Sequence, residues 1–435
     1  MGGGLLQLVA YGAQDVYLTG NPQITFFKSI YRRHTNFSME NIECVFNGKV
    51  DFGQRVVCPL PRNGDLVSRM YLKMTVSKLN QSPIAVHAYL NFLAYRLIEY
   101  ITIEIGGQEI DKQYREWMFI WNELTVPAGK KEGLYDMILA GGHYYQTIAP
   151  LSGNANDETM YLPLNFWFCR NPGLALPLIA LQYHEVKIIV KFTENSGFLY
   201  ALQNSSYGLL SPNTVYPQPI FTASLLVDYI FLDTDERRRF AQNSHEYLIE
   251  QVQYNGNDVI DTNIEGTYNI PINFNHPVKE LFWLITSSDN PNEWITLEED
   301  TDVASFYGEE KNNTYTLKSI KLLLNGHDRF AKRDAKYFES VQSYQHHTNS
   351  PIYALVKGGF SPELVIRYNY GCYSFALHPE EHQPSGTLNF SRIDSAILNV
   401  VSNSISYGKY KLHLFGHSYN VLRVMSGMGG LAYSN

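Results

Sequence analysis

Residues 249–256, IEQVQYNG, spell nearly the same pattern as residues 42–48, IECVFNG, about two hundred positions earlier. Both stretches carry aliphatic side chains and end in the Asn-Gly pair that tight hairpin turns favour. Three more pairs follow in the same order: residues 101–107 with 320–326, 171–178 with 383–390, and 227–232 with 411–415. One such match arises by chance, but four in one order predict a single β-sheet fold used twice.

The composition agrees with two β-rich domains. Of 435 residues, 45% are hydrophobic, which is enough to bury two separate cores. Aromatic residues make up 14%, and these side chains pack well in sheets. Charged residues make up only 17%, which excludes a largely disordered chain. Strand-like segments, few short helices and long, uneven loops predict an all-β protein of two tandem eight-stranded jelly rolls.

Turn-forming and polar segments give the predicted domain boundaries. Residues 1–24 form an N-terminal arm, 25–240 the first jelly roll and 241–435 the second, which ends in a contact tail from about residue 426. The arm and the tail are expected to be contact elements that become ordered on assembly. The glycines of the tail would allow close approach of the backbone to a neighbour.

Two short helices are predicted next to these boundaries. Asn21 and the proline after it are typical of a helix start, and Ile24, Phe27 and Tyr31 would then share one side of the helix. The second helix begins after Asp233, which is followed by acidic residues in the first turn.

The charge balance argues against direct nucleic-acid binding. The formal net charge is −8, whereas binding to nucleic acid draws on cations that neutralise phosphates. The basic clusters at residues 32–33, 130–131 and 237–239 are short, and we interpret them as solvated faces. No charged-then-apolar leader opens the chain, and no apolar run approaches the length of a membrane span.

The histidines do not show the spacing of a metal site. His378 and His382 are separated by a proline that prevents one helix face from carrying both, so a polar loop is predicted there. His346 and His347 are adjacent and are assigned to an exposed loop. His417 lies near a strand end with no carboxylate at a useful spacing.

No other motif specifies a reaction. The four cysteines, Cys44, Cys58, Cys169 and Cys372, lack the paired spacing of a zinc site. We therefore predict no catalytic, cofactor-binding or metal-binding residue, and a protein that is not an enzyme. Asn204 and Asn312, in N-x-S/T triplets within long insertions, are the possible N-glycosylation sites.

Longer segments resemble a known family. They are residues 10–37 (AYGAQDVYLTGNPQITFFKSIYRRHTNF), 227–242 (VDYIFLDTDERRRFAQ), 383–394 (QPSGTLNFSRID) and 419–433 (YNVLRVMSGMGGLAY). Together with shorter matches in order along nearly the whole chain, they resemble the major capsid proteins of nucleocytoplasmic large DNA viruses, particularly those that infect algae.

The resemblance implies a double jelly roll that forms homotrimers, which act as pseudo-hexagonal capsomers and tile an icosahedral shell. It also implies contacts with neighbouring capsomers and minor capsid proteins, an internal viral membrane nearby, assembly in the host cytoplasm and glycans on outer loops. Two alternatives stay open from the sequence. One is a minor capsid paralogue of the same fold, and the other is a tandem β-sandwich protein that binds carbohydrate.

Overall fold

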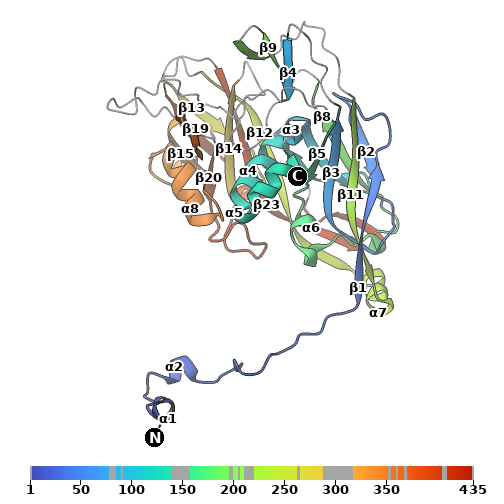
Figure 1. Cartoon of the computed structure of the whole chain (residues 1–435). Helices are drawn as coiled ribbons and strands as arrows, with labels where there is room; N and C mark the ends of the chain where they lie inside the picture. The colour runs from blue at the N-terminus through green and yellow to red at the C-terminus, as the bar shows by residue number, and fades with distance from the viewer. Residues whose placement is uncertain are drawn as a thin grey trace. The chain divides into compact units, whose positions relative to one another are not determined.

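Figure 1 shows the computed structural model of the chain, which describes residues 2–77, 85–89, 92–138, 157–194, 199–203, 206–209, 220–261, 265–287, 317–350, 354–358, 361–366, 370–403 and 409–433. The chain divides into two compact units, Met1–Phe37 and Ser38–Asn435. The first unit contains helices α1 (Gly3–Val9) and α2 (Val16–Thr19), neither of which has a buried residue. The domain boundaries predicted at residues 24 and 240 remain predictions.

The helix predicted after Asn21 is wrong. Residues 20–36 contain no helix, and the φ angle of Asn21 is 50°, which lies outside the right-handed helical region. Short helices gain most of their stability by packing an apolar face on a neighbour. In this unit Ile24, Phe27 and Tyr31 are 69%, 97% and 87% exposed, so that contribution is missing.

The first half of the larger unit forms two antiparallel four-stranded sheets, which we call roll 1. One sheet has the order β1-β11-β3-β7 and the other β2-β8-β5-β6. The strands are β1 (Phe37–Val45), β2 (Arg55–Pro59), β3 (Leu66–Val76), β5 (Ile98–Ile105), β6 (Gln108–Tyr114), β7 (Glu158–Pro163), β8 (Val186–Phe192) and β11 (Phe221–Leu232).

The second half forms roll 2, again with two antiparallel sheets. Their orders are β12-β23-β14-β20 and β13-β22-β15-β16. The strands are β12 (His245–Asp261), β13 (Thr267–Pro271), β14 (Pro277–Ser287), β15 (Leu317–Leu324), β16 (His327–Asp328), β20 (Tyr370–Ser374), β22 (Ala396–Ser402) and β23 (Lys409–Met425). Three short strands extend these sheets: β17 (Arg333–Asp334), β21 (Leu388–Asn389) and β24 (Met428–Leu431).

The strand orders confirm the repeat predicted from the sequence. Strands β1, β11, β3 and β7 occupy the same places in roll 1 as β12, β23, β14 and β20 in roll 2. The two stretches that resemble each other most, residues 42–48 and 249–256, begin in the equivalent strands β1 and β12. The larger unit is therefore a double jelly roll, as predicted.

Other elements lie in the connections between these strands. Two small sheets pair β4 (Ala85–Tyr89), β9 (Leu199–Gln203) and β10 (Ser206–Leu209), and β18 (Ala354–Gly358) with β19 (Ser361–Ile366). The helices are α3 (Leu93–Arg96), α4 (Arg115–Thr125), α5 (Ala128–Ile138), α6 (Trp167–Arg170), α7 (Thr234–Gln242) and α8 (Gln342–His346). Single helical turns are η1 (Pro172–Leu174), η2 (Leu178–Ala180), η5 (Tyr337–Val341) and η6 (Phe390–Arg392).

The helix predicted after Asp233 is confirmed as α7. The Asp233 carboxylate accepts a hydrogen bond from the backbone N–H of Thr234 at 2.7 Å, and Asp235 and Glu236 lie in the first turn. Acidic side chains in that position interact favourably with the positive end of the helix dipole. The local sequence suffices here because the stabilising groups are neighbours along the chain.

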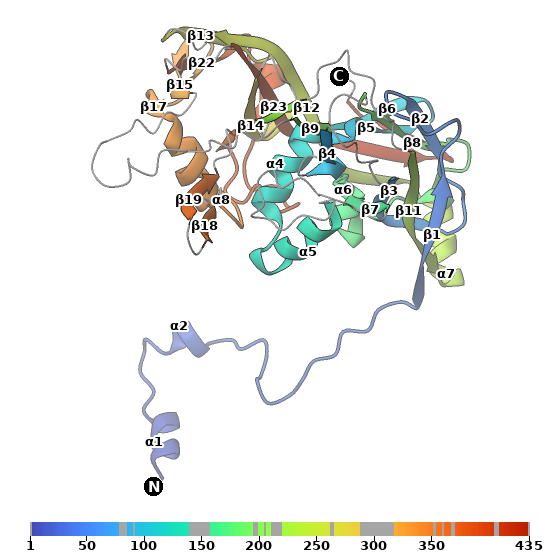
Figure 2. The ribbon, with the colours of Figure 1, turned by 45° about the horizontal axis from the view of Figure 1, so that its top comes forward.

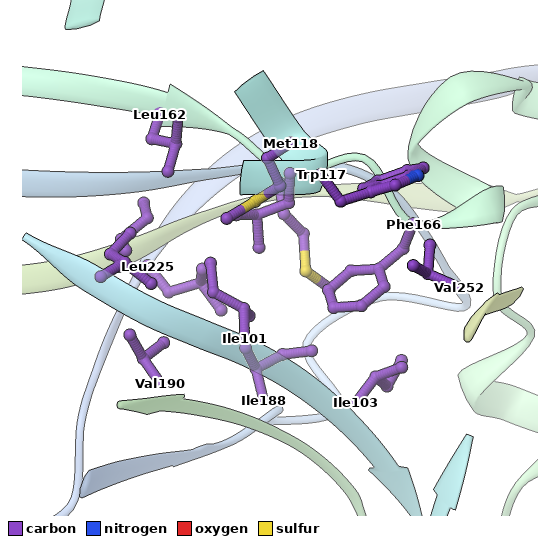
Figure 3. Close-up of a cluster of buried hydrophobic side chains, with 14 of the residues drawn as sticks. Ile101, Ile103, Trp117, Met118, Leu162, Phe166, Ile188, Val190, Leu225 and Val252 are labelled. Atoms are coloured by element: carbon purple, nitrogen blue, oxygen red, sulfur yellow. The ribbon is translucent and has the colours of Figure 1, made fainter. Parts of the chain in front are cut away.

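Roll 1 is filled by apolar side chains from both of its sheets. Figure 3 shows Leu162 and Leu225 from one sheet facing Ile101, Ile188 and Val190 from the other. Each is 1% exposed or less. Complete burial of such a side chain contributes about 1.5–3 kcal/mol, so the facing sheets are held mainly by this apolar contact.

The apolar core of roll 1 continues into roll 2. One buried cluster joins roll 1 side chains to Val252 on β12, Phe282 on β14 and Phe415 on β23. A second cluster fills the interior of roll 2. Figures 1 and 2 both place α4 between the strands of roll 1 and β14 of roll 2. The two rolls therefore share a core rather than meeting only through surface groups.

Candidate assembly site at the junction of the two rolls

Helix α4 supplies the aromatic face of the junction. Its Trp117 and Trp121 side chains are buried, with ring centroids 5.5 Å apart. On the roll 2 side, the His417 ring lies 4.9 Å from Trp121 and nearly perpendicular to it. Trp121 also meets the edge of Phe282 on β14, at 6.4 Å. These contacts fix α4, which is inserted between β6 and α5 in the chain, against the central strands of roll 2.

A buried ionic network crosses the same junction. The carboxylate of Glu250 on β12 lies 2.5 Å from the Arg170 guanidinium at the end of α6, and it also accepts a hydrogen bond from Lys279 on β14. The Arg170 guanidinium also lies over the face of the Trp121 ring, with its Cζ 4.8 Å from the ring centroid. Glu250 is 4% exposed and Lys279 is fully buried. One carboxylate of roll 2 therefore neutralises cations from both rolls.

The network shifts the pKa values of its members. Burial alone would raise the pKa of Glu250, but Arg170, Lys279 and His417 outweigh it, and the pKa lies well below its usual value. Burial and the nearby charge of Lys279 lower the pKa of His417 to about 3, so this imidazole is neutral at pH 7. Sequence spacing gave no carboxylate partner for His417. In the structure its Nε2 lies 3.4 Å from the Glu250 carboxylate, although the two residues are 167 positions apart in the sequence.

A second polar contact between the rolls involves Asp111 on β6. Its carboxylate accepts hydrogen bonds from the backbone N–H of Val252 at 2.9 Å and from the side-chain amide of Gln113 at 2.8 Å. The Gln251 side chain donates in return to the carbonyl oxygen of Ile110. Burial raises the pKa of Asp111 to about 6, although these hydrogen bonds oppose the shift.

The C-terminal segment also joins the rolls. Strand β24 pairs with β23, and the carbonyl oxygen of Gly427, just before it, accepts the backbone N–H of Tyr183 from roll 1 at 2.9 Å. The backbone of Gly429 bonds to the His184 ring. A Cβ on Gly429 would lie 2.6 Å from Leu181, so this glycine permits the close approach. The segment predicted to become ordered on assembly is already a strand within the subunit, up to Leu431.

A third buried polar cluster lies wholly in roll 2. The His347 ring, at the end of α8, is bonded through Nε2 to Glu280 on β14 at 2.6 Å and through Nδ1 to Glu380 at 3.0 Å. The side chains of His347 and Glu280 are fully buried. Burial would lower the pKa of His347, but the charge of Glu280 and hydrogen bonds to Cys372, Glu280 and Glu380 hold it well above its usual value.

The structure corrects the prediction of an exposed loop at His346 and His347, because His346 ends helix α8. The loop predicted at residues 378–382 is confirmed. His347 was predicted in an exposed loop, but its ring is buried because Glu380, from the HPEEH segment, folds over it. His382 of the same segment approaches Glu250 to 3.9 Å. Sequence spacing missed both contacts because each joins segments more than thirty residues apart, while only local pairs can be detected from spacing.

The structure tests the prediction that the basic clusters are solvated, but not the predicted glycosylation sites. Lys131 is not solvated: it is 5% exposed and bonds to Glu123 at 3.1 Å. Arg237 is 62% exposed but pairs with Asp65 at 3.0 Å. Asn204 and Asn312 lie outside the described residues.

Among the helices that the structure describes, none is long and apolar enough to cross a membrane.

Comparisons with known proteins agree with the double-roll fold. Residues 25–233 match the family described as major capsid protein N-terminus, and residues 236–430 match that of the large eukaryotic DNA virus major capsid protein. The major capsid protein of Pyramimonas orientalis virus is 49% identical over the full length of both chains. That of Paramecium bursaria Chlorella virus 1 is 39% identical over both full lengths. The solved PBCV-1 virus capsid matches with a TM-score of 0.74 and 34% identity, covering 94% of this chain and 100% of that chain.

The repeated strand order and the structural match define a double jelly-roll capsid protein, whose role is structural. The chain belongs to the major capsid protein family of large eukaryotic DNA viruses. It is accordingly a protein of the virion capsid, and this family favours a capsid role over the alternative of a carbohydrate-binding module.

Proposed function

We propose that three copies of the chain associate into a pseudo-hexagonal capsomer and that these capsomers tile the icosahedral shell. The observation that supports this most is the equal strand order of the two rolls. Two similar rolls in each of three chains give six similar corners, so a threefold object can occupy a position of hexagonal symmetry. The junction described above would keep the two corners of one subunit at a fixed spacing, because it combines a shared apolar core with buried ion pairs.

The mass of the purified protein tests the trimer. Gel filtration with light scattering is expected to give about three times the 49.8 kDa of one chain. A monomer or a dimer at micromolar concentration would contradict the proposal. A trimer that does not bind carbohydrate in a glycan array would also exclude the carbohydrate-binding alternative.

We also propose that the N-terminal unit is a contact element between subunits or capsomers. It presents apolar side chains that are almost fully exposed, with Tyr17 93%, Phe26 97% and Phe27 97% accessible. Burial of one such aromatic side chain is worth about 1.5–3 kcal/mol, which is a reason for these residues to find a neighbour.

Substitution of both phenylalanines tests this contact. The variant F26S/F27S should fold and form trimers as the parent chain does, but should assemble into larger structures less efficiently, as measured by sedimentation and electron microscopy. The control is K28S, which changes an exposed polar neighbour. Equal assembly by the parent and the double variant would show that the two rings make no such contact, whereas loss of folding would place them in the core.

The proposal also covers the surroundings of the capsid shell in the virion and in the host cell. We propose that the shell lies over an internal viral membrane, contacts minor capsid proteins and is assembled in the host cytoplasm, without direct genome binding by this chain. The net charge of −8 supports the last point. Glycosylation at Asn204 and Asn312 also stays a proposal, which the intact mass of virion-derived N204Q and N312Q variants would test.

A further inference from the structure

We propose that Glu280, His347 and Cys372 form a binding site for a transition metal ion of the Zn²⁺ type, on the buried face of the roll 2 sheet that the α8 segment covers. One ligand atom from each of these buried side chains lies within 4.8 Å of the others. They come from three separate elements: β14, the residue after α8, and β20. The inference rests on the fold of roll 2 and does not depend on trimer formation.

The sheet register brings two of the ligands together. Strands β14 and β20 are antiparallel neighbours in which Glu280 is paired with Ser374 and Phe282 with Cys372. Residues two apart on a strand point to the same face, so Glu280 and Cys372 are diagonal neighbours on one face of the sheet. The segment around α8 then covers this face and inserts the His347 ring, which is fully buried.

The donor set favours a particular class of metal. Thiolate, imidazole and carboxylate are the three ligand types of protein zinc sites. A thiolate is a poor ligand for Mg²⁺ or Ca²⁺, which take oxygen donors. With three protein ligands, the fourth position would be taken by water or by the Ser343 hydroxyl, which lies 3.5 Å from the Cys372 sulfur.

A second observation is the support of the His347 ring. Its Nδ1 is bonded to Glu380, and that carboxylate is itself held by the backbone N–H and the hydroxyl of Thr348, at 2.7 and 2.5 Å. In metal sites a ligating histidine commonly donates its other N–H to a carboxylate, which fixes the ring and its tautomer. Because Glu380 holds Nδ1 of His347, the other ring nitrogen, Nε2, points toward Glu280.

The third observation is an unpaired buried oxygen. Among the described residues, Oε2 of Glu280 has no hydrogen-bond partner, although the side chain is fully buried. A buried carboxylate oxygen without a partner costs free energy, and native structures seldom leave one. A metal ion next to Oε2 would supply the missing partner.

The ligand charges suit a divalent ion. A metal ion binds the deprotonated forms of these side chains, which are the Cys372 thiolate, the neutral His347 imidazole and the Glu280 carboxylate. The two negative ligand charges offset the two positive charges of the ion, which avoids the large cost of an unbalanced buried charge.

The position of the site suggests its structural effect. Asn349, two residues after His347, donates its backbone N–H to the carbonyl oxygen of Leu124 at 2.9 Å, near the end of α4 in roll 1. Its side chain also bonds to the Val126 carbonyl. A metal ion at Glu280, His347 and Cys372 would tie this segment to the sheet and thereby strengthen the junction between the rolls.

Cobalt substitution of the full chain tests the proposal. The protein is purified under reducing conditions, treated with a chelator and titrated with Co²⁺. The expected result is one bound ion per chain with a thiolate-to-metal charge-transfer band, and displacement of that band by Zn²⁺. The variant C372S should lose the band, whereas C169S, which alters a partly buried cysteine outside the cluster, should keep it.

A thermal shift provides a second readout. One equivalent of Zn²⁺ should raise the melting temperature of the parent chain and of C169S, but not that of C372S. Absence of a charge-transfer band in the parent chain would overturn the proposal without reference to any variant. Equal Co²⁺ binding by the parent and a folded C372S would assign the metal to a different site and overturn the proposal as well.

Discussion

Replacement of Glu250 by Gln is the sharpest test of the junction between the rolls. The carboxylate contacts Arg170 at 2.5 Å, and it also accepts from Lys279, whose side chain is fully buried. Removal of one partner from a buried ion pair typically costs about 3–5 kcal/mol, because an uncompensated charge is left behind. Arg170 is 20% exposed, so part of its charge can be solvated, and we expect a loss at the lower end of that range.

The same strand offers a matched control. Glu246 also pairs with an arginine, Arg423, at 2.8 Å, but the two side chains are 59% and 53% exposed. Exposed pairs of this kind contribute about 0–1 kcal/mol. E246Q should therefore change stability little, although it makes the same chemical change on β12.

Urea unfolding at a fixed protein concentration measures the difference. Tryptophan fluorescence is a suitable signal, because Trp117 and Trp121 lie in the junction itself. With an m-value of about 1–3 kcal/mol per molar urea, a loss of about 3 kcal/mol lowers the midpoint by roughly 1–3 M. If the free energies of unfolding of E250Q and E246Q differ by less than about 0.5 kcal/mol, the buried network does not stabilise the junction.

Three further outcomes follow from the same structure. Burial raises the pKa of Asp111 from 3.8 to about 6, so the folded chain binds this proton more tightly than the unfolded chain. As the pH falls from 7 to 4, the free energy of unfolding of the parent chain should therefore rise by up to about 3 kcal/mol relative to that of D111N, measured by urea unfolding at each pH. A parallel pH profile for the two proteins would contradict this. G429V should destabilise the chain by about 1–3 kcal/mol in thermal unfolding, because its Cβ would lie 2.6 Å from Leu181. G129A, in the exposed α5 position with no atom near the new Cβ, should instead be neutral or stabilising by up to about 1 kcal/mol, and a loss as large as that of G429V would refute the steric argument. L162A, in the core of roll 1, should cost about 2–5 kcal/mol, and a cost below 1 kcal/mol would show that the facing sheets are not closely packed.

Local patterns that repeat along the chain were sufficient to predict the fold. The aliphatic runs at residues 42–48 and 249–256 lie in two equivalent strands, β1 and β12. The tight turn predicted at Asn255 and Gly256 is wrong, because both residues lie within β12, where the pairing register with β23 shifts after Asn255. The start of α7 was predicted for the same reason, since Asp233 caps the turn that follows it directly. The helix predicted after Asn21 failed because a cap alone does not stabilise a short helix whose apolar side chains stay exposed.

The junction and the buried clusters depended on tertiary structure. Glu250 and Arg170 are 80 positions apart, and only the packing of α6 against β12 brings them together. Glu280, His347 and Cys372 likewise come from three segments with no common spacing, so a search for metal-binding motifs could not find them. Two jelly rolls were predictable from the amino-acid pattern alone, because strand preferences act between neighbouring residues. Which charged side chains are buried together was decided only by the way the sheets pack, since burial and pairing are properties of the folded chain.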